Sequence, residues 1–538
     1  MVKNGKSGNG SIVSAAFIIG VASLASAFVG LVRQRVFSTH FGAGDTFDAF
    51  IAAFRVPDLI FNLVVIGALS AAFIPMFTEK LVKKSGEEEA YTFASAVLNI
   101  LIIAVVVLAV VYAALAPWFV PLIAPGFEGE KLQLTIRLSQ IMSVQPILLG
   151  ASFVFSGILN SYKRFVAYAL APIFYNLGII AGVIWLVPMM GINGLGWGVV
   201  LGAALHILVQ FPAVLRVGFK WKPVLTSSNS DLKKLWKMMV PRVFGLAAQQ
   251  INLLVVTILG SGLLVGSIAV FNLANNIYNL PITIFGIAFS QAAFPTLAEY
   301  AATKRHSEFR GTLTRTFRYI LFFAIPLSAL FYLFRAQIVR VLFGDGAFDW
   351  EDTVMTFETL GFLVISIFAQ ATIPLLTRAF YAKQDTKTPV IISIISIVAN
   401  VALALWLAPR MGVQGLALAF SIGAIIQLLL LLGILHRQLE GFDDVKVLAS
   451  LMKIVVASIA GAIAAQLLKY PIASFVDMQR FWGVLTQLIG AVFGGLLVYL
   501  VICWLVGSPE LEALKRYLPR RFKMASGTDT PRFEGHQE

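Results

Sequence analysis

Charged residues are scarce in this sequence. Aspartate, glutamate, lysine and arginine make up only 13% of the 538 residues, whereas hydrophobic residues make up 59%. Because a soluble protein carries about 25% charged residues, this composition excludes an ordinary water-soluble domain. Cysteine is also nearly absent. Cys503 stands alone inside an apolar run, so neither a disulfide framework nor a cysteine-based metal cluster is possible.

The sequence also lacks the patterns of an enzyme site. Nothing in it resembles a catalytic triad or a nucleotide-binding fold. The run GLGWGVVLG at 194–202 has no phosphate-loop lysine and no preceding strand, so it predicts close packing between helices. His206 lies inside an apolar run, and we expect it to be a hydrogen-bonded packing residue. The expectation is a non-enzymatic protein without cofactor or metal.

Long apolar runs are what the sequence has in abundance. A helix of about 20 apolar residues crosses roughly 30 Å of hydrocarbon. Such runs predict an all-α polytopic membrane protein with about 14 transmembrane helices. The expected spans are 11–32, 47–77, 91–115, 133–158, 165–186, 193–215, 235–259, 264–294, 313–334, 355–380, 388–408, 413–435, 449–468 and 483–506. The first run imitates a signal peptide, but its full spanning length favours a retained helix.

The basic residues predict the orientation. Most of the 41 lysines and arginines fall in alternate loops, which the positive-inside rule places in the cytoplasm. Both termini are then cytoplasmic, and the opposite loop at 344–352 is acidic. The net charge of +14 is thereby explained, and no nucleic-acid partner is expected.

Two pairs of similar segments reveal an internal repeat. SAAFIPMFTE at 70–79 matches SQAAFPTLAE at 290–299, and PMMGINGL at 188–195 matches PRMGVQGL at 409–416. The nearly constant offset predicts two parallel six-helix lobes, as in alternating-access transporters whose substrate binds between repeats. The expected domains are an N-lobe at 1–225, a C-lobe at 226–440, a helix pair at 441–510 and a basic tail at 511–538.

Charges cluster around the second span. Arg33 and Arg35 end the first span, and Asp48, Arg55 and Asp58 follow. A charge at membrane depth is costly unless it is paired or faces water. We therefore expect a hydrated cleft in which the arginines bind an anionic substrate, since guanidinium suits phosphate. Two alternatives stay open, namely arginines that snorkel to the interface and a structural link between Asp48 and Arg55.

The equivalent region of the second copy, FNLANNIYNLPITIF, is rich in asparagine. Asn275, Asn276 and Asn279 could bond to sugar or amide groups, or could join neighbouring helices. Asn252 in the seventh span has the same two interpretations. Arg242, near the cytoplasmic end of that span, is a further candidate for the cleft or for snorkelling.

Several motifs resemble those of the MurJ/MviN family, the lipid II flippases of the MOP exporter superfamily. The resemblance runs from about residue 14 to about 435. The motifs are FGAGDTFDAF at 41–50, FRVPDLIFN at 54–62, GALSAAFIP at 67–75, GILNSYKRF at 157–165 and FYAKQDTKTPV at 380–390. The resemblance implies a fourteen-helix transporter in which spans 1, 2, 7 and 8 line a cationic cleft. It also implies a groove for a polyprenyl tail at spans 13 and 14.

The resemblance carries over to the site only in part. Arg33, Asp48 and Arg55 match charged positions of the family. Other charged positions of the family pattern are neutral in this sequence, namely Ala27, Phe61, Asn62, Ile66, Asn275 and Asn276. Arg35 is a candidate to supply part of the positive charge that these positions lack.

The resemblance implies a flippase that moves lipid II from the inner to the outer leaflet by alternating access. Its setting would be the bacterial cytoplasmic membrane and its role peptidoglycan biosynthesis, cell wall biogenesis and cell shape. The expected partners are lipid II and membrane lipids, with cell-wall synthesis proteins as further candidates. Three alternatives stay open: a flippase for another polyprenyl-linked glycan, a MATE-like small-molecule exporter, and a scaffold without transport.

Overall fold

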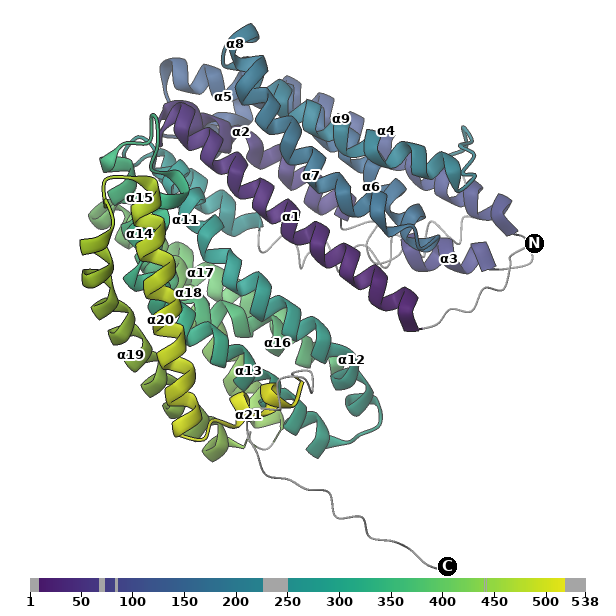
Figure 1. Cartoon of the computed structure of the whole chain (residues 1–538). Coiled ribbons are helices and arrows are strands. Elements are labelled where there is room, and N and C mark those ends of the chain that lie inside the picture. The colour runs from purple at the N-terminus through teal and green to yellow at the C-terminus, as the bar shows by residue number, and fades with distance from the viewer. Residues whose placement is uncertain are drawn as a thin grey trace, which may run out of the picture. The chain divides into compact units, whose positions relative to one another are not determined.

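The computed structural model describes residues 9–66, 73–82, 86–225, 250–439, 441 and 443–517. Every regular element within these ranges is a helix (Figure 1). This result confirms the all-α class expected from the apolar runs.

Helices fill both copies of the repeat. The elements of the first are α1 (Asn9–Phe41), α2 (Asp45–Ile60), η1 (Phe61–Ile66), α3 (Ile74–Val82), α4 (Gly86–Ile123), α5 (Gly129–Met142), α6 (Gln145–Ser161), α7 (Phe165–Ala181), η3 (Gly182–Leu186), α8 (Val187–Met190) and α9 (Asn193–Arg216). An unlabelled helix at Gln250–Ser261 follows. The remaining elements are α11 (Ser267–Pro281), η4 (Ile282–Ile287), α12 (Ala288–Ala302), α13 (His306–Leu333), α14 (Arg335–Phe343), α15 (Trp350–Val364), α16 (Ile367–Ala382), α17 (Lys387–Met411), α18 (Val413–Gln438), α19 (Asp444–Phe475), α20 (Phe481–Leu505) and α21 (Pro509–Tyr517).

The number of spans agrees approximately with the prediction. The described residues hold 11 helices that are long and apolar enough to cross a membrane, or 12 when α15 and α16 count as one broken span. The other two expected spans, 47–77 and 235–259, both include residues outside the described ranges. The chain is thus a multi-pass helical membrane protein, and fourteen is an approximate count.

The chain forms two compact units. Unit 1 comprises Met1–Leu280, Arg335–Ser366 and Thr386–Leu430, and unit 2 comprises Pro281–Phe334, Ile367–Asp385 and Leu431–Glu538. The four domains expected from the repeat remain a prediction.

The repeat is visible in the backbone. Gly191 and Gly412 occupy the same position in the two matching motifs, and both follow a helix end with φ near 65° (66° and 64°). Lys163 and Gln384, which are also 221 residues apart, share a left-handed φ of 58° and 62°. The π-helical turns η1 and η4 begin at the same offset. Shared backbone features at one offset support a duplicated fold.

Glycines bring α7 and α9 together in unit 1. A methyl group added to Gly178 would lie 2.3 Å from the Cα atom of Gly202, and one added to Gly182 would lie 2.5 Å from the Cα atom of Gly198. Any side chain would therefore push the helices apart. This close approach confirms the packing role predicted for residues 194–202.

His206 is a satisfied packing residue, as predicted. Its Nδ1 atom lies 2.7 Å from the Ser152 hydroxyl, which also accepts a hydrogen bond from the Gln210 amide at 2.8 Å. Ser156 donates to the Gln210 side-chain oxygen at 2.8 Å. The resulting network ties α6 to α9.

Unit 2 contains a closely packed pair of long helices, α19 and α20, which Figure 1 shows side by side. A methyl group on Gly495 would lie 2.7 Å from the Cβ atom of Ala465 and 2.8 Å from the Gly461 carbonyl oxygen. Small residues thus let the two backbones approach, as in many membrane helix pairs.

A buried carboxylate fixes the last helix of unit 2. Glu510 in α21 is only 1% exposed and accepts a hydrogen bond from Arg318 Nε of α13 at 2.7 Å. It also accepts hydrogen bonds of 2.7 Å from the hydroxyls of Ser450 in α19 and Ser508. One side chain therefore joins α13, α19 and α21.

Candidate functional site

A tyrosine lies between charged residues of α1 and α2. α1 carries Arg33, α2 carries Arg55 and Asp58, and α7, which packs along α1, carries Tyr175. Arg33 and Asp58 both interact electrostatically with Tyr175, and Arg55 interacts with Asp58. The structure thus brings together three residues that the sequence proposed. We call these four residues the arginine–tyrosine site.

The Tyr175 hydroxyl is an unused hydrogen-bonding group. It is buried and has no hydrogen-bond partner within the described part of the chain. Tyr175 lines a cavity of about 340 Å³ in unit 1, together with Phe61, Phe153 and Asn160. A buried polar group without a partner costs about 1–3 kcal/mol, so such a group points to a ligand or water that completes it.

Arg55 also connects α2 with the second copy of the repeat. Its Nε atom donates a 2.8 Å hydrogen bond to the Thr257 hydroxyl in the helix Gln250–Ser261. Thr257 in turn donates to the Leu253 carbonyl oxygen at 2.9 Å. No hydrogen bond of the two Arg55 Nη atoms occurs within the described ranges. These two atoms can therefore engage an anion while Nε fixes the side chain.

Asp48 caps the start of α11. Its carboxylate accepts hydrogen bonds from the backbone N–H groups of Gly266 at 2.8 Å and Ala269 at 2.9 Å. Lys131 of α5 lies 2.9 Å from Asp48 and 2.7 Å from Asp45. A carboxylate at a helix N-terminus is stabilised by the free N–H groups and the helix dipole. These contacts give Asp48 a structural role, but its partners are α11 and Lys131, and the expected link to Arg55 is not among them.

Arg35 faces the segment between α14 and α15. Its guanidinium donates to the Val341 carbonyl oxygen at 2.8 Å and forms a 3.2 Å ion pair with Asp345. Nearby, the Ala43 backbone N–H donates to the Asp352 carboxylate at 2.8 Å. Arg35, Ala43 and Asp48 therefore hold the same end of unit 1, where α1 meets α2. We call this group of contacts the end latch.

The asparagines of α11 bond mainly within their own helix. The Asn276 amide donates to the Asn272 side-chain oxygen at 3.0 Å, and the Asn279 amide donates to the Asn275 carbonyl oxygen at 2.8 Å. Asn279 is exposed, and Asn275 and Asn276 are half-buried. These bonds leave acceptor or donor capacity on each amide, so the asparagines stay candidates for binding a polar group.

Asn252 has a partner on another helix. Its side-chain oxygen accepts a 2.9 Å hydrogen bond from the Asn400 amide of α17. This geometry matches the helix-joining interpretation. Arg242 lies outside the described residues.

Sequence reasoning missed four residues that matter in this region. Tyr175 is hidden in the apolar run YALAPIFYNLG, and Thr257 resembles any other threonine in a span. Lys131 and Asp352 stood out only as charges in predicted loops or span ends. The one available signal was that buried aspartates need partners, and Asp48 had none nearby in sequence.

Taken together, the duplicated six-helix plan and a charged site within the spans define a class of polytopic helical membrane protein typical of transporters. A family model described as "Lipid II flippase MurJ" matches residues 37–486. The chain belongs to the MurJ lipid II flippase family. It is 31% identical to a probable lipid II flippase MurJ of Haemophilus influenzae over 504 residues, which cover 89% of this chain and 98% of the relative.

One further relative and two solved structures are also similar to this chain. The chain is 28% identical to a probable lipid II flippase MurJ of Rhizobium tropici, over 95% of this chain and 97% of the relative. A solved structure of lipid II flippase MurJ in an inward closed conformation matches with a TM-score of 0.75 and 25% identity, over 90% of this chain and 98% of that one. An inward-facing MATE family transporter of the MOP superfamily shares the fold, with a TM-score of 0.64 at 15% identity.

Proposed function

We propose that this protein is a flippase that moves lipid II from the inner to the outer leaflet of the bacterial cytoplasmic membrane by alternating access. The observation that carries the proposal is the arginine–tyrosine site, which joins two guanidinium groups and an unused hydroxyl in a chain of the MurJ family. Guanidinium groups offer paired donors that match the oxygens of a pyrophosphate. Substrate binding, not catalysis, is the role of this site.

The other candidates have supporting roles in this proposal. Arg33 and Arg55 attract the pyrophosphate, and Asp58 limits the net charge of the empty site. Asn275, Asn276 and Asn279 contact the sugar or peptide. With both termini in the cytoplasm, the end latch faces outward and closes the site on that side during loading. Its contacts must break before the substrate can leave to the outer leaflet.

Complementation tests the proposal. The chain is expressed in bacteria depleted of their own lipid II flippase, and the lipid II that reaches the outer leaflet is quantified. We expect rescue by the unmodified chain and a loss of at least tenfold with Arg33→Ala. The matched control is Arg137→Ala, which removes an exposed arginine from α5 of the same unit. Normal transport by a membrane-inserted Arg33→Ala variant would contradict the role of Arg33.

A second candidate substrate is another polyprenyl-linked glycan. It is favoured by Asn275 and Asn276 of α11, which stand where the family pattern is charged and which suit sugar hydroxyls better than phosphate. Failure of complementation by a well-inserted chain, together with tighter binding of a different lipid-linked sugar than of lipid II, would select this candidate.

A further inference from the structure

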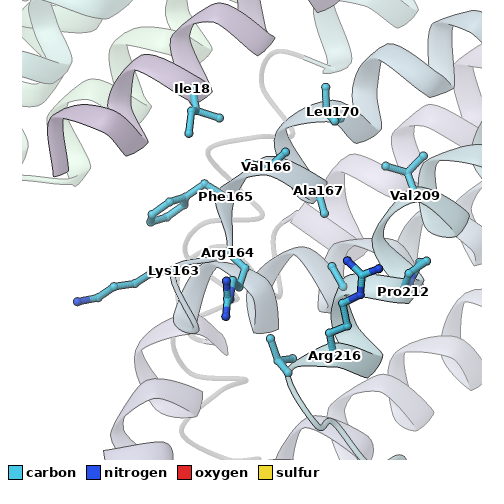
Figure 2. Close-up of a pocket in the computed structure, with 12 residues that line it drawn as sticks. Ile18, Lys163, Arg164, Phe165, Val166, Ala167, Leu170, Val209, Pro212 and Arg216 are labelled. Carbon is cyan, nitrogen blue, oxygen red and sulfur yellow. The ribbon is translucent and has the colours of Figure 1, made fainter. Parts of the chain in front are cut away.

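A second cavity lies at the other end of unit 1 from the end latch. It has a volume of about 680 Å³ and lies among Ile18 of α1, the turn between α6 and α7, the first residues of α7 and the end of α9 (Figure 2). Three of its lining residues are cationic, namely Lys163, Arg164 and Arg216, and none is acidic. The arginine–tyrosine site shares no residue with it, so this basic cavity is a separate feature.

The cationic side chains of this cavity have no protein partner in the part of the chain that the structure describes. Within the described residues, Lys163, Arg164 and Arg216 make no ion pair and no side-chain hydrogen bond, and all three are exposed. In Figure 2 the Arg216 side chain extends from the end of α9 toward Pro212, whereas Lys163 extends outward from the turn. Charge that no carboxylate neutralises is available to an anion.

The backbone adds donors at the same place. Arg164 precedes the first residue of α7, and this helix start has neither a side-chain cap nor an acidic residue in its first turn. Phe165, Val166 and Ala167 of that turn all line the cavity. The first N–H groups of a helix lack partners within the helix and favour a bound anion. The cavity thus combines guanidinium groups with free backbone donors.

The walls around the cavity are apolar and exposed. Val166 of α7 is 54% exposed, and Leu208 and Leu215 of α9 are 58% and 56% exposed. In a multi-pass membrane protein such residues face lipid chains. We propose that the basic cavity binds the phosphate headgroup of an anionic phospholipid of the inner leaflet, whose acyl chains lie against α7 and α9. Basic cavities between spans at the cytoplasmic face suit such headgroups.

Charge complementarity decides the occupant. Residues 1–44 contain no aspartate or glutamate, so this part of the sequence has no carboxylate to offer the cavity. A zwitterionic lipid carries a positive group beside its phosphate. Three positive side chains therefore attract its headgroup less strongly. A volume of about 680 Å³ is within the range of small-ligand sites and can hold a glycerol phosphate headgroup.

Native mass spectrometry of the full-length protein tests the proposal. The protein is titrated with phosphatidylglycerol, with phosphatidylcholine and with soluble glycerol 3-phosphate as a competitor. We expect preferential retention of phosphatidylglycerol, and about tenfold weaker retention by Arg164→Gln/Arg216→Gln. Equal retention of both phospholipids, or displacement by millimolar glycerol 3-phosphate, would overturn the proposal, the latter by showing a site for free phosphate.

Two further variants make the result specific. Arg305→Gln/Arg315→Gln removes the same charge from unit 2, and Arg305 precedes α13 with nearly the same backbone angles as Arg164 before α7. This control should retain the lipid within about twofold. Val209→Trp fills the cavity and keeps every charge, so it should lose the lipid. A control that loses as much lipid as the cavity variant, or a filled cavity that retains it, would contradict binding at this place.

Discussion

The Asp48 carboxylate accepts a 2.8 Å hydrogen bond from the backbone N–H of Gly266, 218 residues further along the chain. The bond joins the first turn of α2 to the residue that precedes α11, and α2 and α11 are equivalent helices of the two repeats. Buried charge is expensive in a membrane protein, and this one is neutralised by helix N–H groups and by Lys131. Asp48 therefore connects the two copies of the repeat within unit 1.

Asp48→Asn should destabilise unit 1 by about 3 kcal/mol, because it leaves the start of α11 without its anion and leaves Lys131 with only the exposed Asp45. Thermal unfolding of the purified protein in nanodiscs measures the effect. The control is Asp45→Asn. Asp45 pairs with the same lysine, but its side chain is 59% exposed, against 2% for the side chain of Asp48. An exposed pair contributes about 0–1 kcal/mol. Equal losses for the two variants would show that the α11 cap does not contribute.

Gly266→Ala should be among the most damaging single changes in the chain. The new methyl group would lie 1.7 Å from the Ala43 carbonyl oxygen, and the φ of +84° adds backbone strain. Gly86→Ala is the matched control, since Gly86 also has a positive φ (+69°) but no atom of the described residues within 4 Å of the added methyl group. We expect the control to lower the free energy of unfolding by about 1 kcal/mol. Gly266→Ala should lower the amount of folded protein in the membrane. Normal yield of Gly266→Ala would contradict this close contact.

Tyr175→Phe should separate stability from transport. Because the Tyr175 hydroxyl is buried without a partner in the described part of the chain, its removal should leave stability unchanged or raise it by about 1 kcal/mol. Transport should fall at least threefold if this hydroxyl binds the substrate. The control is Tyr112→Phe. The Tyr112 hydroxyl donates to Ser139 at 3.0 Å, so its removal should lower the free energy of unfolding by about 1 kcal/mol. Unchanged transport by Tyr175→Phe would exclude the hydroxyl from the binding site.

Glu510 should make unit 2 sensitive to acid. Burial alone would raise the pKa of Glu510, but hydrogen bonds from Ser450 and Ser508 and the charge of Arg318 outweigh burial and hold the pKa below the usual 4.5. A lowered folded-state pKa stabilises the protein above about pH 4.5, and this stabilisation is lost as the pH falls through the lower folded-state value.

The variant Glu510→Gln checks this linkage. It should lower the unfolding temperature at pH 7, where the carboxylate is charged, and the difference from the unmodified chain should shrink below pH 4.5. The exposed neighbour Glu512 serves as control, and Glu512→Gln should have little effect at either pH. A difference that stays constant from pH 7 to pH 4 would contradict the linkage.

The sequence was sufficient for the fold class because membrane spans leave a local signal. Each span satisfies its backbone hydrogen bonds within itself, so apolar length alone reveals it. The repeat was visible for a similar reason, since Gly191 and Gly412 must adopt a left-handed φ that favours glycine. The count of spans agrees only approximately, because two expected spans, 47–77 and 235–259, include residues outside the described ranges.

The site was less predictable because its partners are distant in sequence. The sequence proposed Arg33, Arg55 and Asp58, and the structure places Arg33 and Asp58 near Tyr175 and Arg55 near Asp58. The partners of Arg35 and Asp48, by contrast, lie 306 and 218 residues away and include backbone groups that carry no sequence signal. Only the packing of the helices determines such pairs.

The π-helical turns also bear on the history of the chain. η1 and η4 begin 221 residues apart, the offset of the repeat, whereas η3 has no counterpart because α17 is an unbroken helix at the equivalent position. A turn present in both copies is most simply inherited from a half-length ancestor that existed before its gene was duplicated. The turn found in one copy alone marks a difference that appeared between the two halves after duplication.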